Sequence, residues 1–414
     1  MMKEISVKLV ALAEERNKFH FRNMVVENRD EFTKSRETSS LLTLPELIGR
    51  NQDKEKIIKV LLEAALERDE LVSVLSIWSM DKVNYIDDDL PDGGPVRGFP
   101  SLEVLTMKNL SSLKGLSRQE GKELFPLLRR MEIENFDGNE EAICFPEEVL
   151  RNLTLLKSLD ICQFTKLKSF PNGLAHLKAL NSLYISHCHK LKSLPEEGLR
   201  GLESLQCLSI RYCEEFSSLS KGLQHLVCLE SLVIFGCPKL VALPEGIKHL
   251  KSLQRLEMGG YSAMSLVPCA VLVALPETLQ HVPALRYLFI SSYPTLISLP
   301  DWLGNLTTLQ SLIISCCLKI SSLPASIQRL TELRSLLIFN CGPELARRCE
   351  KGKGKDWHKI AQIPQVDVDA PTKPKGYNGN TMAASSEVVA ASVQMHCWRK
   401  LVGCSGGLKI NRLA

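Results

Sequence analysis

A short phrase of apolar residues, Leu-x-x-Leu-x-Ile, returns along most of the chain and constrains the fold more than any other feature. One copy reads Leu180-Asn-Ser-Leu183-Tyr-Ile185. The first leucines of ten copies follow one another at a mean step of about 26 residues, at positions 102, 128, 156, 180, 205, 229, 253, 285, 309 and 333. A period of this length is typical of a solenoid, in which each unit buries its apolar face only against its neighbours.

Each copy begins with a short strand. In Leu183-Tyr184-Ile185 the side chains alternate inward, outward and inward, as a strand with one buried face requires. Three residues after the isoleucine, five copies carry a cysteine, and others carry Phe164, Tyr261 or Tyr293; the cysteines are Cys188, Cys213, Cys237, Cys317 and Cys341. We interpret them as a buried structural ladder, because a small side chain with a weak S–H donor suits the turn that follows a strand.

A second recurring phrase, such as Leu194-Pro195, predicts where the chain leaves the sheet, since proline donates no ladder hydrogen bond. An acidic residue such as Glu196 often follows, which we expect when proline takes the first position of a helical turn. We therefore predict an α/β fold: a leucine-rich repeat solenoid of about ten repeats. A curved parallel sheet would form its concave side, and short helices or 3₁₀ turns its convex side. The long step from Leu253 to Leu285 predicts a bulged loop.

The full repeat phrase and the closing stretch resemble the leucine-rich repeat domain of plant intracellular disease-resistance receptors of the coiled-coil, nucleotide-binding type. The closing stretch contains Cys341-Gly-Pro-Glu-Leu345 and Asp356-Trp-His-Lys-Ile360, and it looks like the terminal repeat of that family. This resemblance covers roughly residues 99–369. It implies a short helical coiled-coil remnant at 1–40, a stub of the nucleotide-binding domain at 41–80 with a first strand at 71–77, and a linker at 81–98. Residues 370–414 match no repeat, and we expect a disordered tail.

The resemblance implies binding of ADP or ATP, but the sequence lacks the phosphate loop G-x-x-x-x-G-K-[ST]. Ile77 is followed by Trp78-Ser-Met-Asp-Lys82 instead. We therefore expect no nucleotide or other cofactor. An ADP/ATP-binding signalling receptor encoded by a partial gene model, and a non-functional remnant, remain alternatives.

The remaining features point away from catalysis and from other partner classes. The net charge of +4 is too small to indicate a nucleic-acid partner. We find no apolar segment of about 20 residues and no secretion signal, so we expect a cytoplasmic chain without a membrane span. His187-Cys188-His189 lacks a further ligand at metal-like spacing, and we predict neither a metal site nor a catalytic residue.

The outward positions of the strands are the candidate functional surface. Nine of them are predicted to bind a protein partner: Tyr184, Arg211, Val233, Phe235, Glu257, Phe289, Ile313, Leu337 and Phe339. Several are large and apolar, and such groups along a sheet add up to a patch that indicates an interface. The alternative is that β-propensity alone selects them. The expected function is non-enzymatic recognition of a pathogen effector or a host protein in plant defence. The oligomeric state is not predicted.

Overall fold

The structure is a computed structural model. It describes residues 74–78, 99, 101–109, 124–135, 150–240, 242–260, 275–293 and 295–368. The expectations for residues 1–40, for 41–80 except 74–78, for 81–98, and for 370–414 lie outside the described residues. The same holds for the bulged loop expected before Leu285, of which residues 261–274 are not described.

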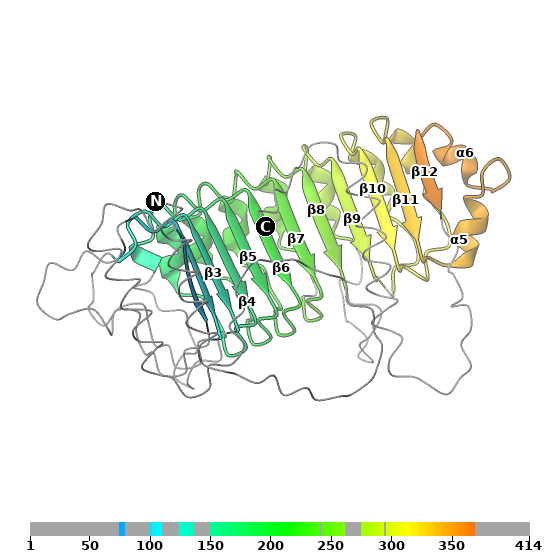
Figure 1. Ribbon diagram of the computed structural model, residues 1–414. Coiled ribbons are helices and arrows are strands. Elements are labelled where there is room, and N and C mark those ends of the chain that lie inside the picture. Colours follow the sequence, from blue (N-terminus) through cyan, green and yellow to red (C-terminus); the bar gives the residue numbers. More distant parts are fainter. Residues whose placement is uncertain are drawn as a thin grey trace, which may run out of the picture. The chain divides into compact units, whose positions relative to one another are not determined.

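The described residues form one parallel sheet of twelve strands, in which each strand pairs with the strands before and after it in sequence (Figure 1). This order follows from the repeats, because each unit places one strand beside the last. The strands are β1 (Val74–Trp78), β2 (Val104–Lys108), β3 (Arg130–Glu134), β4 (Ser158–Cys162), β5 (Ser182–Ser186), β6 (Cys207–Arg211), β7 (Ser231–Phe235), β8 (Arg255–Gly259), β9 (Tyr287–Ser291), β10 (Ser311–Ser315), β11 (Ser335–Phe339) and β12 (Gln365–Val368).

Strands β2 to β11 are the ten strands that the repeats predict. The second and fourth residues of each strand, such as Leu183 and Ile185, point into a core that runs from repeat to repeat. The register pairs like with like, so that Leu183 faces Leu208 and Ile185 faces Ile210 in the next strand. Each repeat therefore covers the apolar face of its neighbour, and the expected leucine-rich repeat fold is confirmed.

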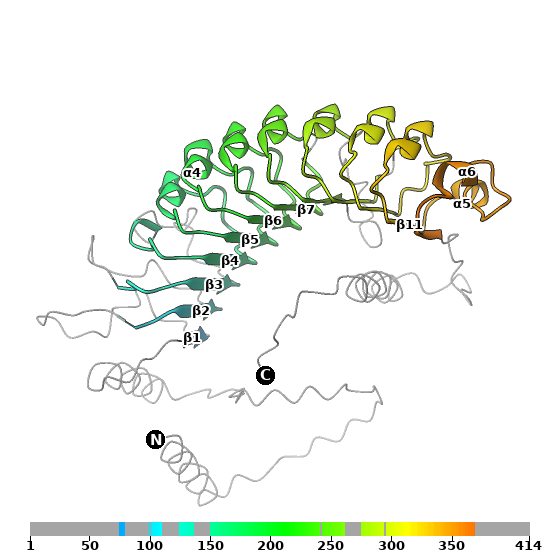
Figure 2. The ribbon, with the colours of Figure 1, turned by 90° about the horizontal axis from the view of Figure 1, so that it is seen from above.

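Short helices lie on the convex side of the array, and the sheet lies on its concave side (Figure 2). Most are 3₁₀ helices of a single turn or little more. They are η1 (Asn172–His176), α4 (Glu196–Arg200), η2 (Lys221–His225), η3 (Glu245–His249), η4 (Glu277–His281), η5 (Asp301–Asn305) and η6 (Ala325–Arg329).

The recurring prolines stand one residue earlier than the sequence predicted. Pro195 and Pro244 take the N-cap position rather than the first helical position, with φ of −68° and −69° and extended ψ of 138° and 152°. The fixed φ of proline suits both positions, but an extended ψ directs the chain out of the sheet before the helix begins. The acidic residues Glu196 and Glu245 are then the first helical residues, near the positive end of the helix.

The strand predicted to open a nucleotide-binding domain belongs to the repeat sheet. β1 lies within one residue of the predicted 71–77 at its C-terminal end, and it pairs in parallel with β2, Val74 opposite Val104 and Leu75 opposite Leu105. Its Val-Leu-Ser-Ile-Trp sequence has the same alternation as the repeat strands, which explains why it extends the same sheet. The sheet therefore begins before residue 99.

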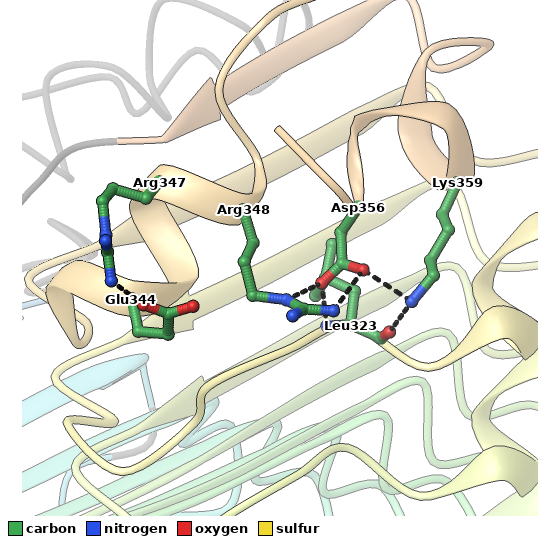
Figure 3. A network of polar contacts seen from close by, with 6 residues as sticks. All are labelled: Leu323, Glu344, Arg347, Arg348, Asp356 and Lys359. Atoms are coloured by element: carbon green, nitrogen blue, oxygen red, sulfur yellow. Dashed lines mark hydrogen bonds and ion pairs between the residues drawn. The ribbon is translucent and has the colours of Figure 1, made fainter. Parts of the chain in front are cut away.

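The last repeat is closed by a cap made of α5 (Pro343–Arg348), α6 (Trp357–Ile360) and β12. Its centre is Asp356, whose side chain is 1% exposed (Figure 3). Arg348 donates to both carboxylate oxygens at 2.8 and 2.9 Å, Lys359 lies 2.7 Å from Oδ1, and the backbone N–H of Leu323 donates at 3.2 Å. Burial disfavours the ionised form, but these donors outweigh it and lower the pKa of Asp356 to about 2.

Candidate functional site

The strand register places the nine predicted residues on the face of the sheet opposite the core, in two adjacent rows. The middle row runs across β5 to β11 through Tyr184, Ser209, Val233, Glu257, Phe289, Ile313 and Leu337. The second row lies two residues further along each strand, through Ser186, Arg211, Phe235, Gly259, Ser291, Ser315 and Phe339. The structure thus brings all nine residues to one face, and their role in binding a partner stays a prediction.

Five of the nine residues, Glu257 and four apolar ones, are buried, which the sequence pattern did not predict. Val233, Leu337 and Phe339 are each 5% exposed, and Ile313 is 1% exposed. Ile313, Leu337 and Phe339 form an apolar cluster of their own, separate from the main core, with Tyr287 and Phe289 packed against it. Alternation along a strand says which face a side chain points to, but neighbouring side chains on that face decide whether it stays exposed.

An aromatic platform remains on the concave face between β7 and β9. The rings of Phe235 and Phe289 stack with centroids 6.4 Å apart and planes 14° from parallel, although β8 lies between their strands. Gly259 on β8 makes this possible, because a Cβ there would come within 2.8 Å of the Phe235 ring. The Tyr212 ring also contacts the Phe235 ring edge-to-face, with ring centroids 6.0 Å apart. Both phenylalanines are partly exposed.

A charged cluster lies beside this platform and centres on Glu257, which is 8% exposed. Arg255 binds the Glu257 carboxylate through Nε, at 2.8 Å, and through Nη2, and the Nη2 of Arg211 lies 3.5 Å from it. The Arg255 guanidinium also lies 4.1 Å above the ring centroid of Tyr287, a cation–π contact. Sequence reasoning missed Arg255 and Tyr287, which start their strands in a third outward row.

Acidic side chains lie on the same face at β3 and β4. Glu132 and Asp160 face each other in the register, and Glu134 lies at the end of β3. Arg130 contacts Glu132 at 2.7 Å, and Lys108 pairs with Glu134. Burial and the neighbouring Glu132 carboxylate raise the pKa of Asp160 above its ordinary value. None of these residues was among the predicted nine, although their outward strand positions were available as a signal.

The ladder cysteines are buried in the core, as predicted, and they are not bonded to one another as disulfides. Each thiol lies near the carbonyl oxygen two residues before it, for example Cys317 Sγ at 3.3 Å from the oxygen of Ser315. Burial raises the pKa of Cys317 to about 12 and that of Cys341 to about 11. These two thiols stay protonated at neutral pH, which suits a structural role rather than a nucleophilic one.

Two histidines, His187 and His189, flank the ladder residue Cys188. The rings of His187 and His189 are 6.2 Å apart and nearly perpendicular, and His187 packs at 4.8 Å against the ring of Tyr212. Burial, with a smaller effect of His189, lowers the pKa of His187. Across the part of the chain that the structure describes, no three His, Cys, Asp or Glu side chains are grouped so as to hold a metal ion. Likewise, no helix in that part is long and apolar enough to span a bilayer.

Comparison with known proteins finds relatives for part of the chain. No family model matches the chain. It is 42% identical over 119 residues to the disease resistance protein RGA2 of Solanum bulbocastanum, and this alignment covers 24% of the chain and 12% of RGA2. It is 40% identical over 79 residues to the putative disease resistance protein RGA1 of the same plant, covering 19% and 8%. The aligned stretches of this chain are therefore homologous to parts of plant disease resistance proteins. The chain spans no more than about an eighth of the length of either relative.

Two solved structures are also similar. The repeat domain of the type III effector XopL superposes with a TM-score of 0.48 at 24% identity, covering 73% of this chain and 86% of that one. The Toll–Spätzle complex from Drosophila gives a TM-score of 0.44 at 16% identity, covering 72% of this chain and 43% of the matched chain.

Proposed function

We propose that the chain recognises another protein through the concave face of its sheet, as part of plant defence. The observation that carries the proposal is the concave face itself, where aromatic and charged side chains gather that the core does not use. Tyr184 is 38% exposed on β5, and Phe235 and Phe289 present partly exposed rings. Aromatic and arginine side chains are enriched at protein interfaces, and they supply most of the binding energy there.

Homology of part of the chain to disease resistance proteins supports the defence context. Within that context we propose a pathogen effector or a host regulatory protein as the partner, and the cytoplasm as the place of recognition. The proposal assigns no chemical reaction to the chain, since recognition by packing and charge needs none.

The experiment compares capture of leaf proteins by the wild-type chain and by a double variant, Tyr184→Ser with Phe235→Ser. Phe339 is unsuitable for this purpose because it is buried, and its removal would leave a cavity. The matched control carries Val227→Ser and Ile297→Ser, which remove apolar side chains that are 55% and 66% exposed outside the three outward rows.

We expect the concave-face variant to capture at least tenfold less of each specific partner than the wild type, although its thermal unfolding is unchanged. The control variant should capture as much as the wild type. Equal capture by wild type and the folded concave-face variant would contradict the proposal. Each aromatic anchor truncated at an interface costs roughly 1–2 kcal/mol, which sets the expected scale.

We also propose that this chain holds no adenine nucleotide, because its sequence contains no phosphate loop. Mass spectrometry of small molecules released from the purified chain tests this. Retained ADP at a stoichiometry near one would instead support the alternative of a nucleotide-dependent signalling receptor.

A further inference from the structure

Two groups of charges with opposite net sign lie on the concave face between β2 and β8. On β2 to β4, three carboxylates, Glu132, Glu134 and Asp160, face two cations, Lys108 and Arg130. One negative charge is therefore left over in this group of described residues. It is best assigned to Asp160, which makes no hydrogen bond or ion pair with any described residue.

The second group has one positive charge in excess. Arg211 and Arg255 share the single carboxylate of Glu257, which is itself nearly buried. The side chains of the two arginines are 39% and 45% exposed, so their free N–H groups still face the solvent. A guanidinium that already donates to one carboxylate keeps donors for a second.

Apolar side chains occupy the space between and beside these groups. Tyr184 is the register partner of Asp160 in the next strand, and it is the exposed aromatic of that stretch. Phe235 lies beside Arg211 in the register, and its ring stacks on Phe289 further along the sheet. Along the sheet, the negative group at Asp160 is therefore followed by the aromatic ring of Tyr184. Beyond this ring lie the positive group and the aromatic platform.

The spacing of the strands sets how many residues a bound polypeptide segment needs in order to reach from the negative group to the positive group. Adjacent strands lie about 4.8 Å apart, so measured across the sheet β4, which carries Asp160, is about 10 Å from β6, which carries Arg211, and about 19 Å from β8, which carries Arg255. An extended chain covers about 3.3 Å per residue, so these distances correspond to about three and about six residues.

Building on the proposed function, we infer that the concave face binds an extended polypeptide segment of mixed charge. The segment carries one Lys or Arg that pairs with Asp160 and, three to six residues away, one Asp or Glu that pairs with Arg211 or Arg255. An apolar side chain between them lies on Tyr184 or on the Phe235–Phe289 platform. Complementary charges of this kind fix the register of a partner and exclude segments of a single sign.

Synthetic fluorescent peptides of ten residues test the inference by fluorescence anisotropy at low salt. Each carries one Lys, one Phe and one Asp among Ser and Gly, with Lys and Asp three to six residues apart, in both chain orders. Controls replace the charged pair by Lys and Lys, by Asp and Asp, or by Gln and Asn. We expect the best mixed-charge peptide to bind at least threefold more tightly than every control, and to lose that advantage in 0.5 M salt.

Variants of the chain then assign the two ends. Asp160→Asn should lower the affinity for the mixed-charge peptide about three- to tenfold, but it should not change the affinity for a peptide in which Lys is replaced by Gln. Arg211→Gln should likewise lower the affinity for the mixed-charge peptide, but not for a peptide in which Asp is replaced by Asn. Glu230→Gln and Lys251→Gln, which change exposed charges outside the strand rows, are the matched controls. Circular dichroism checks that each variant is folded.

Three results would overturn the inference. The first is that none of the peptides binds, and the second is that mixed-charge and single-sign peptides bind equally well. The third is that Asp160→Asn weakens binding of the peptide with Lys replaced by Gln as much as binding of the mixed-charge peptide. The proposed function fails separately, when protein capture ignores the concave-face variant. If capture depends on Tyr184 and Phe235 while no mixed-charge peptide binds, recognition by this face stands and the mixed-charge segment is wrong.

Discussion

At the residue scale, the turn after each strand depends on a left-handed backbone conformation. The residue just before each ladder cysteine has a positive φ, between 50° and 66° for His187, Tyr212, Gly236, Cys316 and Asn340. Most side chains adopt this region at a cost, and glycine and asparagine adopt it most readily. An Asn or Gly directly before the ladder position is therefore a sequence signal for this turn, independent of the alternation along the strand.

Alanine substitutions at two glycines with positive φ distinguish the cost of backbone strain from the cost of a steric clash. A Cβ on Gly236 (φ 66°) would lie 2.6 Å from the ring of Tyr212, whereas a Cβ on Gly352 (φ 74°) would meet nothing within 4 Å. We expect Gly352→Ala to destabilise by about 1 kcal/mol and Gly236→Ala by about 2 kcal/mol or more. Thermal unfolding of both variants measures this, and an equal loss would argue against the close contact with Tyr212.

The buried thiols allow a second prediction at this scale. At pH 8, iodoacetamide should modify the exposed Cys228 within minutes but leave Cys317 and Cys341 unmodified until the chain unfolds. Burial excludes the reagent and keeps the thiols protonated, since their pKa values are about 12 and 11. Peptide mapping by mass spectrometry locates the label. Labelling of Cys317 in the folded chain at the rate of Cys228 would contradict the structural role.

At the scale of elements, the cap of α5, α6 and β12 closes the open end of the last repeat. A repeat array needs such a terminal unit because its final apolar face has no further neighbour. The sequence predicted the stretch only through its resemblance to a terminal repeat. Neither periodicity nor propensity indicated β12, or the burial of Asp356 between Arg348 and Lys359, because both depend on contacts between distant residues.

We expect Asp356→Asn to destabilise the cap by roughly 2–4 kcal/mol at pH 7, because Arg348 and Lys359 lose their shared carboxylate. The pKa of Asp356 is about 2 in the folded chain, below the ordinary value near 4. Its stabilisation is therefore fully present above pH 4 and is lost as the pH falls toward 2.

Thermal unfolding at pH 7 and at pH 2.5 tests both statements. The difference in melting temperature between wild type and Asp356→Asn should be large at pH 7 and small at pH 2.5. Asp301→Asn, an exposed aspartate at the start of η5, should behave like wild type at both pH values. A wild-type-to-variant difference that is equal at both pH values would show that the charge of Asp356 contributes nothing.

At the scale of the whole molecule, the sequence predicted the arrangement of the sheet and core better than the surface. A period of about 26 residues with one strand per unit leaves little choice but a parallel sheet in sequence order, as the register confirms. The surface depends on contacts between strands. Glycine at 259 lets Phe235 reach Phe289, and Ile313 is buried by its neighbours, and neither follows from alternation along one strand.

The claim on which the functional account rests is that the concave face is the recognition surface. Covalent footprinting of the chain alone and with a captured partner tests it most directly, by comparing oxidation of Tyr184 and Phe235 with that of Val227 and Ile297. The account predicts that the partner protects Tyr184 and Phe235 at least severalfold and leaves Val227 and Ile297 unchanged. Protection of Val227 or Ile297 with unchanged oxidation of Tyr184 and Phe235 would contradict it.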